Sequence, residues 1–67
     1  MYSRSEIENL IDTYIVGRNA IRNRQILKDK LIDGLTYEQI AEKVDLTDRQ
    51  VKNIVRKAKN QLFTKLK

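Results

Sequence analysis

Residues 35–57 read LTYEQIAEKVDLTDRQVKNIVRK, a stretch that contains two helix starts close together. Thr36 is followed three residues later by Gln39, and Thr47 is followed three residues later by Gln50. A hydroxyl residue with Gln three positions on is typical of a capping box, in which each side chain bonds the backbone N–H of the other residue. The stretch therefore predicts the start of a short helix and, soon after it, the start of a second one.

The two predicted helices span residues 37–44 and 48–65, with a short turn around Asp45 between them. Two helices joined by a turn of three or four residues form the helix-turn-helix arrangement. In this arrangement the short helix braces the longer helix that follows it. The residues expected on the inner face of the short helix are Ile40, Ala41 and Val44.

Two more amphipathic helices are predicted before this pair, over residues 5–16 and 19–33. Gly17 separates them, and Gly34 stands where a left-handed residue commonly ends a helix, with Leu35 as its hydrophobic partner. Their expected inner faces consist of Ile7, Leu10, Ile11, Tyr14 and Ile15 in the first, and of Ile21, Ile26, Leu27, Leu31 and Ile32 in the second.

Composition supports one small all-α domain over residues 1–67, a four-helix bundle without a wing. Proline is absent, glycine occurs twice, and good helix formers such as Leu, Lys, Arg, Glu and Gln dominate. The chain has no Cys and no His, which removes disulfides, thiolate zinc ligands and the commonest general base. We therefore expect no metal, no cofactor and no enzyme activity. No apolar run is long enough to cross a bilayer, so we expect a cytoplasmic protein associated with the nucleoid.

Positive charge is concentrated at the C-terminal end of the chain. Residues 1–35 carry six basic and five acidic side chains, whereas residues 47–67 carry seven basic side chains and only Asp48 as an acid. A basic end of this kind is typical of a protein that binds a polyanion. The alternative is a solvated lysine face without a partner.

The last predicted helix has a core face and an outer face when residues advance by 100° each. Val51, Ile54, Val55, Ala58 and Leu62 share one side, and long donors and amides occupy the other. Arg can bond guanine, Asn can bond adenine, and Lys can neutralise phosphate. Because the N-terminal part of such a helix enters the major groove of DNA, we take this outer face as the candidate binding surface. The candidate DNA-binding residues are Thr47, Arg49, Gln50, Lys52, Asn53 and Arg56, with Lys57 and Lys59 as backbone contacts.

Phe63 does not fit this division, because it lies about 120° from the core line. We expect the first helix to cover it, and the alternative is a dimer contact. Phe63 and Tyr14 are therefore the candidate residues for a protein interface. The chain has no aromatic-rich surface for stacking unpaired bases, which favours duplex DNA over RNA as a partner.

Residues 23–67 resemble the domain at the C-terminal end of bacterial sigma factors that binds the promoter −35 element. The shared motifs are Gly34-Leu35 with TYEQIA over residues 36–41, then Thr47 with Val51-Lys52, then a basic segment with Ala58 and Leu62. The resemblance implies a helix-turn-helix whose second helix reads the major groove through Arg49, Lys52, Asn53 and Arg56, with Thr47 on a phosphate.

The sequence departs from that family in two ways. Asp45 occupies the turn position usually held by Gly, although Asp tolerates the left-handed region better than most residues. The initial Met suggests that the 67 residues are the whole protein, and they contain no second domain for the −10 element. We therefore expect a small bacterial or phage transcription regulator, not a complete sigma factor.

The leading functional hypothesis is a sequence-specific regulator of transcription that binds double-stranded DNA. A single module of this size makes few base contacts, so a homodimer or a partner on adjacent DNA is expected. The alternative is a protein-interaction module, an adaptor or anti-sigma-like factor that binds RNA polymerase or another regulator. Target sequence, activation or repression, and oligomeric state stay open.

Overall fold

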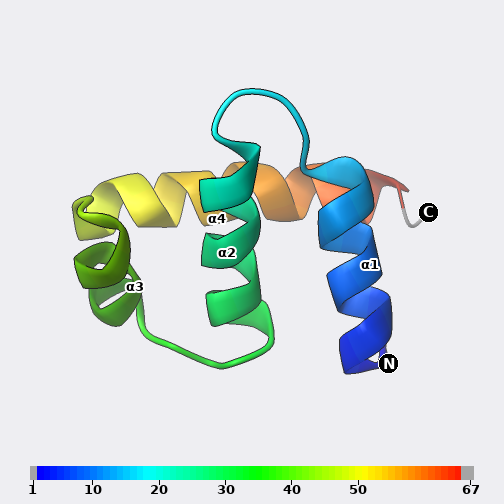
Figure 1. Ribbon diagram of the computed structural model, residues 1–67, viewed down its shortest axis with the longest axis horizontal. Helices are drawn as coiled ribbons and strands as arrows, with labels where there is room; N and C mark the ends of the chain where they lie inside the picture. Colours follow the sequence, from blue (N-terminus) through cyan, green and yellow to red (C-terminus); the bar gives the residue numbers. More distant parts are fainter. Residues whose placement is uncertain (1, 66–67) are drawn as a thin grey trace.

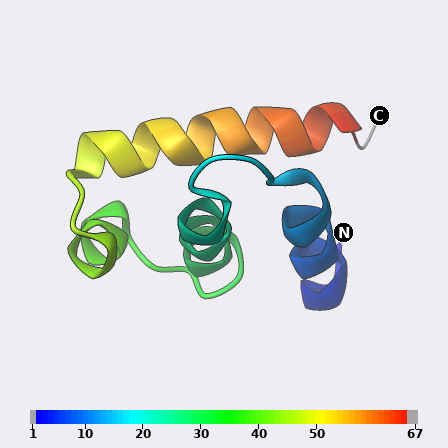
Figure 2. The same ribbon diagram turned by 45° about the horizontal axis from the view of Figure 1, so that its top comes forward.

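The computed structural model describes residues 2–65, which fold into helices without any strand (Figure 1). Figure 2 shows the first three helices side by side, with the last and longest one running across all of them. The elements are α1 (Arg4–Tyr14), α2 (Ala20–Leu31), α3 (Tyr37–Val44) and α4 (Asp48–Lys65). The all-α class and the four-helix arrangement are confirmed, and α3 and α4 have the predicted bounds.

Local side-chain caps start three of the helices. Thr36 N–H donates to Gln39 Oε1 at 2.9 Å, and Gln39 N–H donates to Thr36 Oγ1 at 3.1 Å. Thr47 N–H donates to Gln50 Oε1 at 3.0 Å, and Gln50 N–H donates to Thr47 Oγ1 at 3.2 Å. Both predicted capping boxes are therefore confirmed. A third box starts α1, where Ser3 is the cap.

The helix α1 ends at Tyr14, two residues before the predicted end. Ile15 is extended, with φ −90° and ψ 95°, and only 5% of it is exposed. The carbonyl of Ile15 lies outside the helix and accepts a 2.7 Å hydrogen bond from Arg24 Nε of α2. The chain thus leaves the helix to bury Ile15, and a left-handed turn through Gly17 (φ 92°) and Asn19 (φ 62°) leads into α2.

The end of α2 confirms the predicted role of Gly34, although the helix itself stops at Leu31. Gly34 is left-handed with φ 71°, and Leu35 N–H returns to the carbonyl of Asp29 at 3.0 Å. The last turn also widens, because Asp33 N–H reaches back five residues to the carbonyl of Lys28 at 3.1 Å. The predicted range placed residues 32 and 33 in the helix, but they lie in the turn that follows it.

The core lies where α4 crosses the other helices. The predicted inner face of α4 is confirmed, with Val51, Val55, Ala58 and Leu62 buried and Ile54 half-buried. The prediction for Ile21 is wrong, because 85% of this residue is exposed. The buried residues Ile26 and Leu27 set the inner line of α2, and advancing by 100° per residue puts Ile21 about 170° from that line. The buried apolar residues are Ile11, Ile15, Ile26, Leu27, Ile40, Ala41, Val51, Val55, Ala58 and Leu62.

The turn between α3 and α4 places Asp45 in the left-handed region, with φ 56° and ψ 46°. A left-handed residue with a Cβ costs roughly 1 kcal/mol, and a carboxylate at the C-terminal end of a helix also opposes the helix dipole. We therefore expect Asp45→Gly to stabilise the domain by about 1 kcal/mol, which raises Tm by roughly 4–8 °C in a chain of this size. Asp45→Asn, which removes the charge and keeps the side chain, should give an intermediate Tm. A lower Tm for Asp45→Gly would show that the left-handed conformation of Asp45 does not destabilise the domain.

Candidate nucleic-acid interface

The outward face of α4 carries the residues that the sequence marked as DNA contacts. Val51 and Val55 fix the orientation of the helix, since both are buried against the rest of the bundle. The opposite side faces away from α1, α2 and α3, and it is open to solvent. Exposed on it are Arg49, Gln50, Lys52, Asn53, Arg56 and Lys57, while Lys59 is half-buried and Thr47 is exposed in the turn before the helix.

The short helix α3 braces the start of this face. Ile40 and Ala41 of α3 are buried, and α3 packs against α4 and α2. Leu46 N–H returns to the carbonyl of Ala41 at 3.0 Å, which closes the turn between the two helices. The first turn of α4 is therefore held at a fixed place on the bundle while its outer side stays accessible.

Thr47 and Gln50 already have a role in the free protein. Besides the two backbone bonds of the capping box, Thr47 Oγ1 lies 3.2 Å from Gln50 Oε1 and donates to it. The carbonyl end of Gln50 is thus held at the start of α4. Both residues lie at the exposed tip of the helix, and their contact with DNA remains a prediction.

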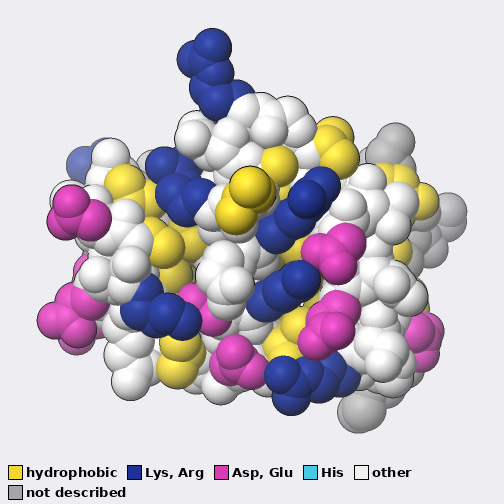
Figure 3. All heavy atoms as spheres, in the orientation of Figure 1, with side chains coloured by type: hydrophobic (Ala, Val, Ile, Leu, Met, Phe, Trp, Pro, Cys, Tyr) yellow, Lys and Arg dark blue, Asp and Glu magenta, His cyan; other side chains and the backbone are white. Residues whose placement is uncertain are grey.

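The cations of α4 from Arg49 to Lys59 have no acidic partner within the described residues. The ion pairs join Arg4 to Glu8 (3.3 Å) and Asp33 (3.5 Å), Lys28 to Asp12 (3.0 Å), and Lys43 to Asp29 (2.9 Å). All of these residues belong to the α1–α3 part of the chain, where acidic and basic side chains intermingle on the surface (Figure 3). The positive charge of α4 is therefore available to an external anion.

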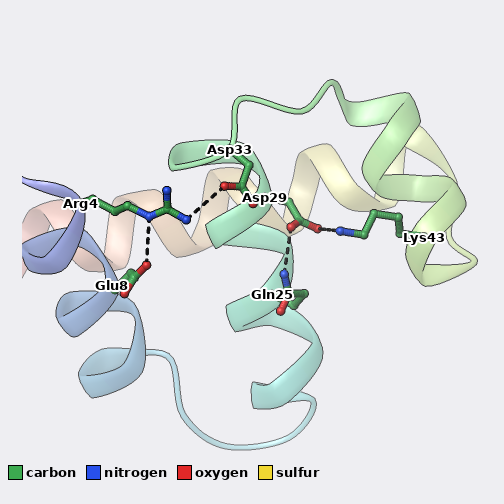
Figure 4. A network of polar contacts seen from close by, with 6 residues as sticks. All are labelled: Arg4, Glu8, Gln25, Asp29, Asp33 and Lys43. Carbon is green, nitrogen blue, oxygen red and sulfur yellow. Dashed lines mark hydrogen bonds and ion pairs between the residues drawn. The ribbon is translucent and has the colours of Figure 1, made fainter.

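A buried carboxylate that sequence reasoning missed connects α2 to α3. Asp29 is 1% exposed, and its two oxygens accept 2.9 Å hydrogen bonds from Gln25 Nε2 and Lys43 Nζ (Figure 4). Figure 4 also shows Arg4, which pairs with Glu8 within α1 and with Asp33 just after the end of α2. Periodicity gives no signal for Asp29, because a lone acid next to an inner face normally lies outward. Its partner Lys43, in the last turn of α3, is 14 residues away in the chain.

Tyr37, at the first position of α3, lies between cations of two helices. Lys30 Nζ is 4.3 Å from the centre of its ring, and Lys52 Nζ is 5.6 Å from it. A pocket opens beside this ring along one flank of α4. Its lining residues are Tyr37, Lys52, Val55, Arg56, Lys59 and Asn60.

The expectation that α1 covers Phe63 is wrong, because Phe63 is 48% exposed. The helix α1 does reach α4, where Gln61 Nε2 donates to the carbonyl of Tyr14 at 3.1 Å. Tyr14 itself is half-buried and packs against the core. The contact between α1 and α4 thus lies beside Phe63 on the helix and leaves its ring accessible.

Within residues 2–65, no helix has the length and apolar character needed to span a membrane. The same part of the chain contains no group of three or more acidic side chains placed to hold a metal ion.

Comparison with known proteins gives one family. The family model described as "Sigma-70, region 4" matches residues 20–62, which covers α2, α3 and most of α4. The helix α1 lies outside the match. Neither the curated proteins nor the solved structures gave a significant match.

Proposed function

Because the chain belongs to the sigma-70 region 4 family and carries its DNA-binding helix-turn-helix domain, we propose that it is a transcription regulator that binds double-stranded DNA at specific sequences. The proposal places the N-terminal half of α4 in the major groove. The small helix α3 then lies across the backbone beside it, as the first helix of this motif does in other proteins.

The observation that carries this proposal is the exposed face of α4, which presents cations without acidic partners among the described residues and the side-chain amide of Asn53. Arg49 can bond the O6 and N7 atoms of guanine, and Asn53 can bond the N6 and N7 atoms of adenine. Lys52 and Arg56 lie on the same face and can bond bases or phosphates. All four side chains are exposed, and none forms an ion pair within residues 2–65 that would have to break first.

Size implies that a single copy binds weakly. A single small module buries roughly 600–1,000 Å² of protein surface on DNA, below the range of most specific complexes. We therefore propose that two copies, or one copy and a neighbouring protein, occupy the target together. A protein of this kind acts at the nucleoid in the cytoplasm of a bacterium, whether the gene is bacterial or from a phage.

Selection from a pool of random duplexes is the direct test. We expect the wild-type protein to enrich one motif, and Arg49→Ala or Asn53→Ala to lose preference at one base pair each, at a cost of about 1–3 kcal/mol. Lys57→Ala is the matched control: it should weaken binding to all sequences alike and reduce the salt dependence without changing the motif. If no motif is enriched, or if Arg49→Ala and Asn53→Ala leave it unchanged, α4 does not read DNA bases.

Phe63 supports a second function, contact with a partner protein such as RNA polymerase or a second copy of the chain. Aromatic rings are enriched in protein interfaces, and this one is exposed on the last turns of α4. Phe63→Ser should weaken capture of purified polymerase, or lower the apparent mass in sedimentation if the partner is a second copy. Unchanged results in both measurements would remove this role.

A further inference from the structure

We propose that the pocket beside Tyr37 is a phosphate site that holds one backbone phosphate of the bound DNA. This inference rests on the proposed function and adds a specific anchor to it. Tyr37 and Val55 form its apolar walls, and the polar groups around them are all donors or amides. These polar residues are Lys52, Arg56, Lys59 and Asn60.

The pocket gathers three cations without a carboxylate. Lys52, Arg56 and Lys59 form no ion pair in the described part of the chain, and no acid lines the pocket. Like charges held together in this way repel one another in the free protein. A phosphate between them removes that repulsion, and binding also releases counterions from the DNA.

Tyr37 orders this site before any ligand binds. The ring attracts the ammonium groups of Lys30 and Lys52, whose Nζ atoms lie 4.3 and 5.6 Å from its centre. Lys30 Nζ also donates to the carbonyl of Leu35 at 3.4 Å, which helps to hold this ammonium group beside the ring. Lys52 is thereby restrained near the pocket, so less side-chain entropy is lost when it binds. Tyr37 is thus a positioning residue and not itself a phosphate ligand.

The position of the pocket on α4 favours a phosphate of the DNA backbone as its ligand. With 100° per residue, Lys52 and Lys59 lie within about 20° of each other on one flank, and Arg49 lies about 60–80° further round on the outer face. A helix in the major groove has the phosphates of the two strands along its flanks. The Tyr37 flank would meet one strand, and the opposite flank, which carries Lys57 in a separate groove with Ile54 and Gln61, would meet the other.

The test combines single methylphosphonate substitutions in the selected duplex with protein variants. Each substitution replaces one charged phosphate by a neutral group. We expect the wild-type protein to lose roughly fivefold to tenfold in affinity at 0.1 M salt when the anchored phosphate is neutralised. Lys59→Gln should lose a similar factor on unmodified DNA and be clearly less sensitive than the wild type to neutralisation of that phosphate, with its preferred motif unchanged. Lys57→Gln, which removes the same charge from the other flank, should keep the full sensitivity there.

Tyr37→Leu and Tyr37→Phe separate positioning from packing. Tyr37→Phe keeps the ring and should bind as the wild type does. Tyr37→Leu keeps an apolar wall but no ring. It should reduce the affinity for the duplex and the sensitivity to neutralisation of the same phosphate. A thermal unfolding curve checks that this variant is folded. If Lys59→Gln binds the duplex as tightly as the wild type and keeps the full sensitivity to neutralisation of the phosphate, the phosphate site alone is overturned. A wild-type protein that binds no duplex would overturn the proposed function and the site together.

Discussion

Leu27→Ala is expected to lower the free energy of unfolding by about 3–5 kcal/mol, a large share of the stability of a domain of this size. Leu27 has no exposed surface, and its helix α2 packs against each of the other three helices. Truncation of a fully buried Leu costs about 3–5 kcal/mol, which includes the cavity that remains. Domains have roughly 0.05–0.15 kcal/mol of stability per residue, so a chain of 67 residues has about 3–10 kcal/mol in total.

Ile21→Ala is the matched control for Leu27→Ala. Both residues are apolar and lie on α2, but Ile21 is 85% exposed, and we expect its truncation to change stability by less than about 0.5 kcal/mol. Urea titration followed by circular dichroism at 222 nm measures both variants. If Leu27→Ala unfolds at a urea concentration close to that of Ile21→Ala, the assignment of Leu27 to the centre of the core is wrong.

Lys43→Met is expected to destabilise the domain by about 2–4 kcal/mol, a large effect for a side chain that is 49% exposed. The loss comes from Asp29, whose side chain is 1% exposed and whose carboxylate would keep only the Gln25 hydrogen bond. A buried charge without its partner costs more than the ion pair itself contributes. The same change also removes an ion pair between α3 and α2, so α3 would brace α4 less well.

A double-mutant cycle separates this effect from the simple loss of a lysine. Asp29→Asn combined with Lys43→Met leaves no buried charge, so the double variant should be more stable than Lys43→Met alone. Lys57→Met removes an exposed lysine without an ion pair in the described residues, and it should change stability by less than about 0.5 kcal/mol. Equal urea midpoints for Lys43→Met and Lys57→Met would show that Asp29 finds another partner.

Features that depend on neighbouring residues could be predicted without the structure. The capping boxes at Thr36 and Thr47 join residues three positions apart, and they set the starts of α3 and α4. Between them, the resemblance to the sigma-factor domain placed Asp45 at a turn position usually held by Gly, and this residue is left-handed. The inner and outer faces of α4 could be predicted from helical periodicity, because a long helix repeats its pattern of apolar and polar residues over several turns. Local chemistry and periodicity were therefore sufficient to predict the fold class and the candidate DNA face.

Features that join distant parts of the chain depend on how the helices pack, and they could not be predicted from the sequence. The early end of α1 depends on the burial of Ile15 and on its bond with Arg24, nine residues further on. The burial of Asp29 depends on Lys43, 14 residues away, and the pocket at Tyr37 depends on the crossing of α3 and α4. Local propensity and periodicity act over one or two turns, whereas the packing of one helix on another sets which side of each is buried. For this reason Ile21 lies on the surface: it is apolar like the core residues, but it is on the side of α2 that faces away from the core.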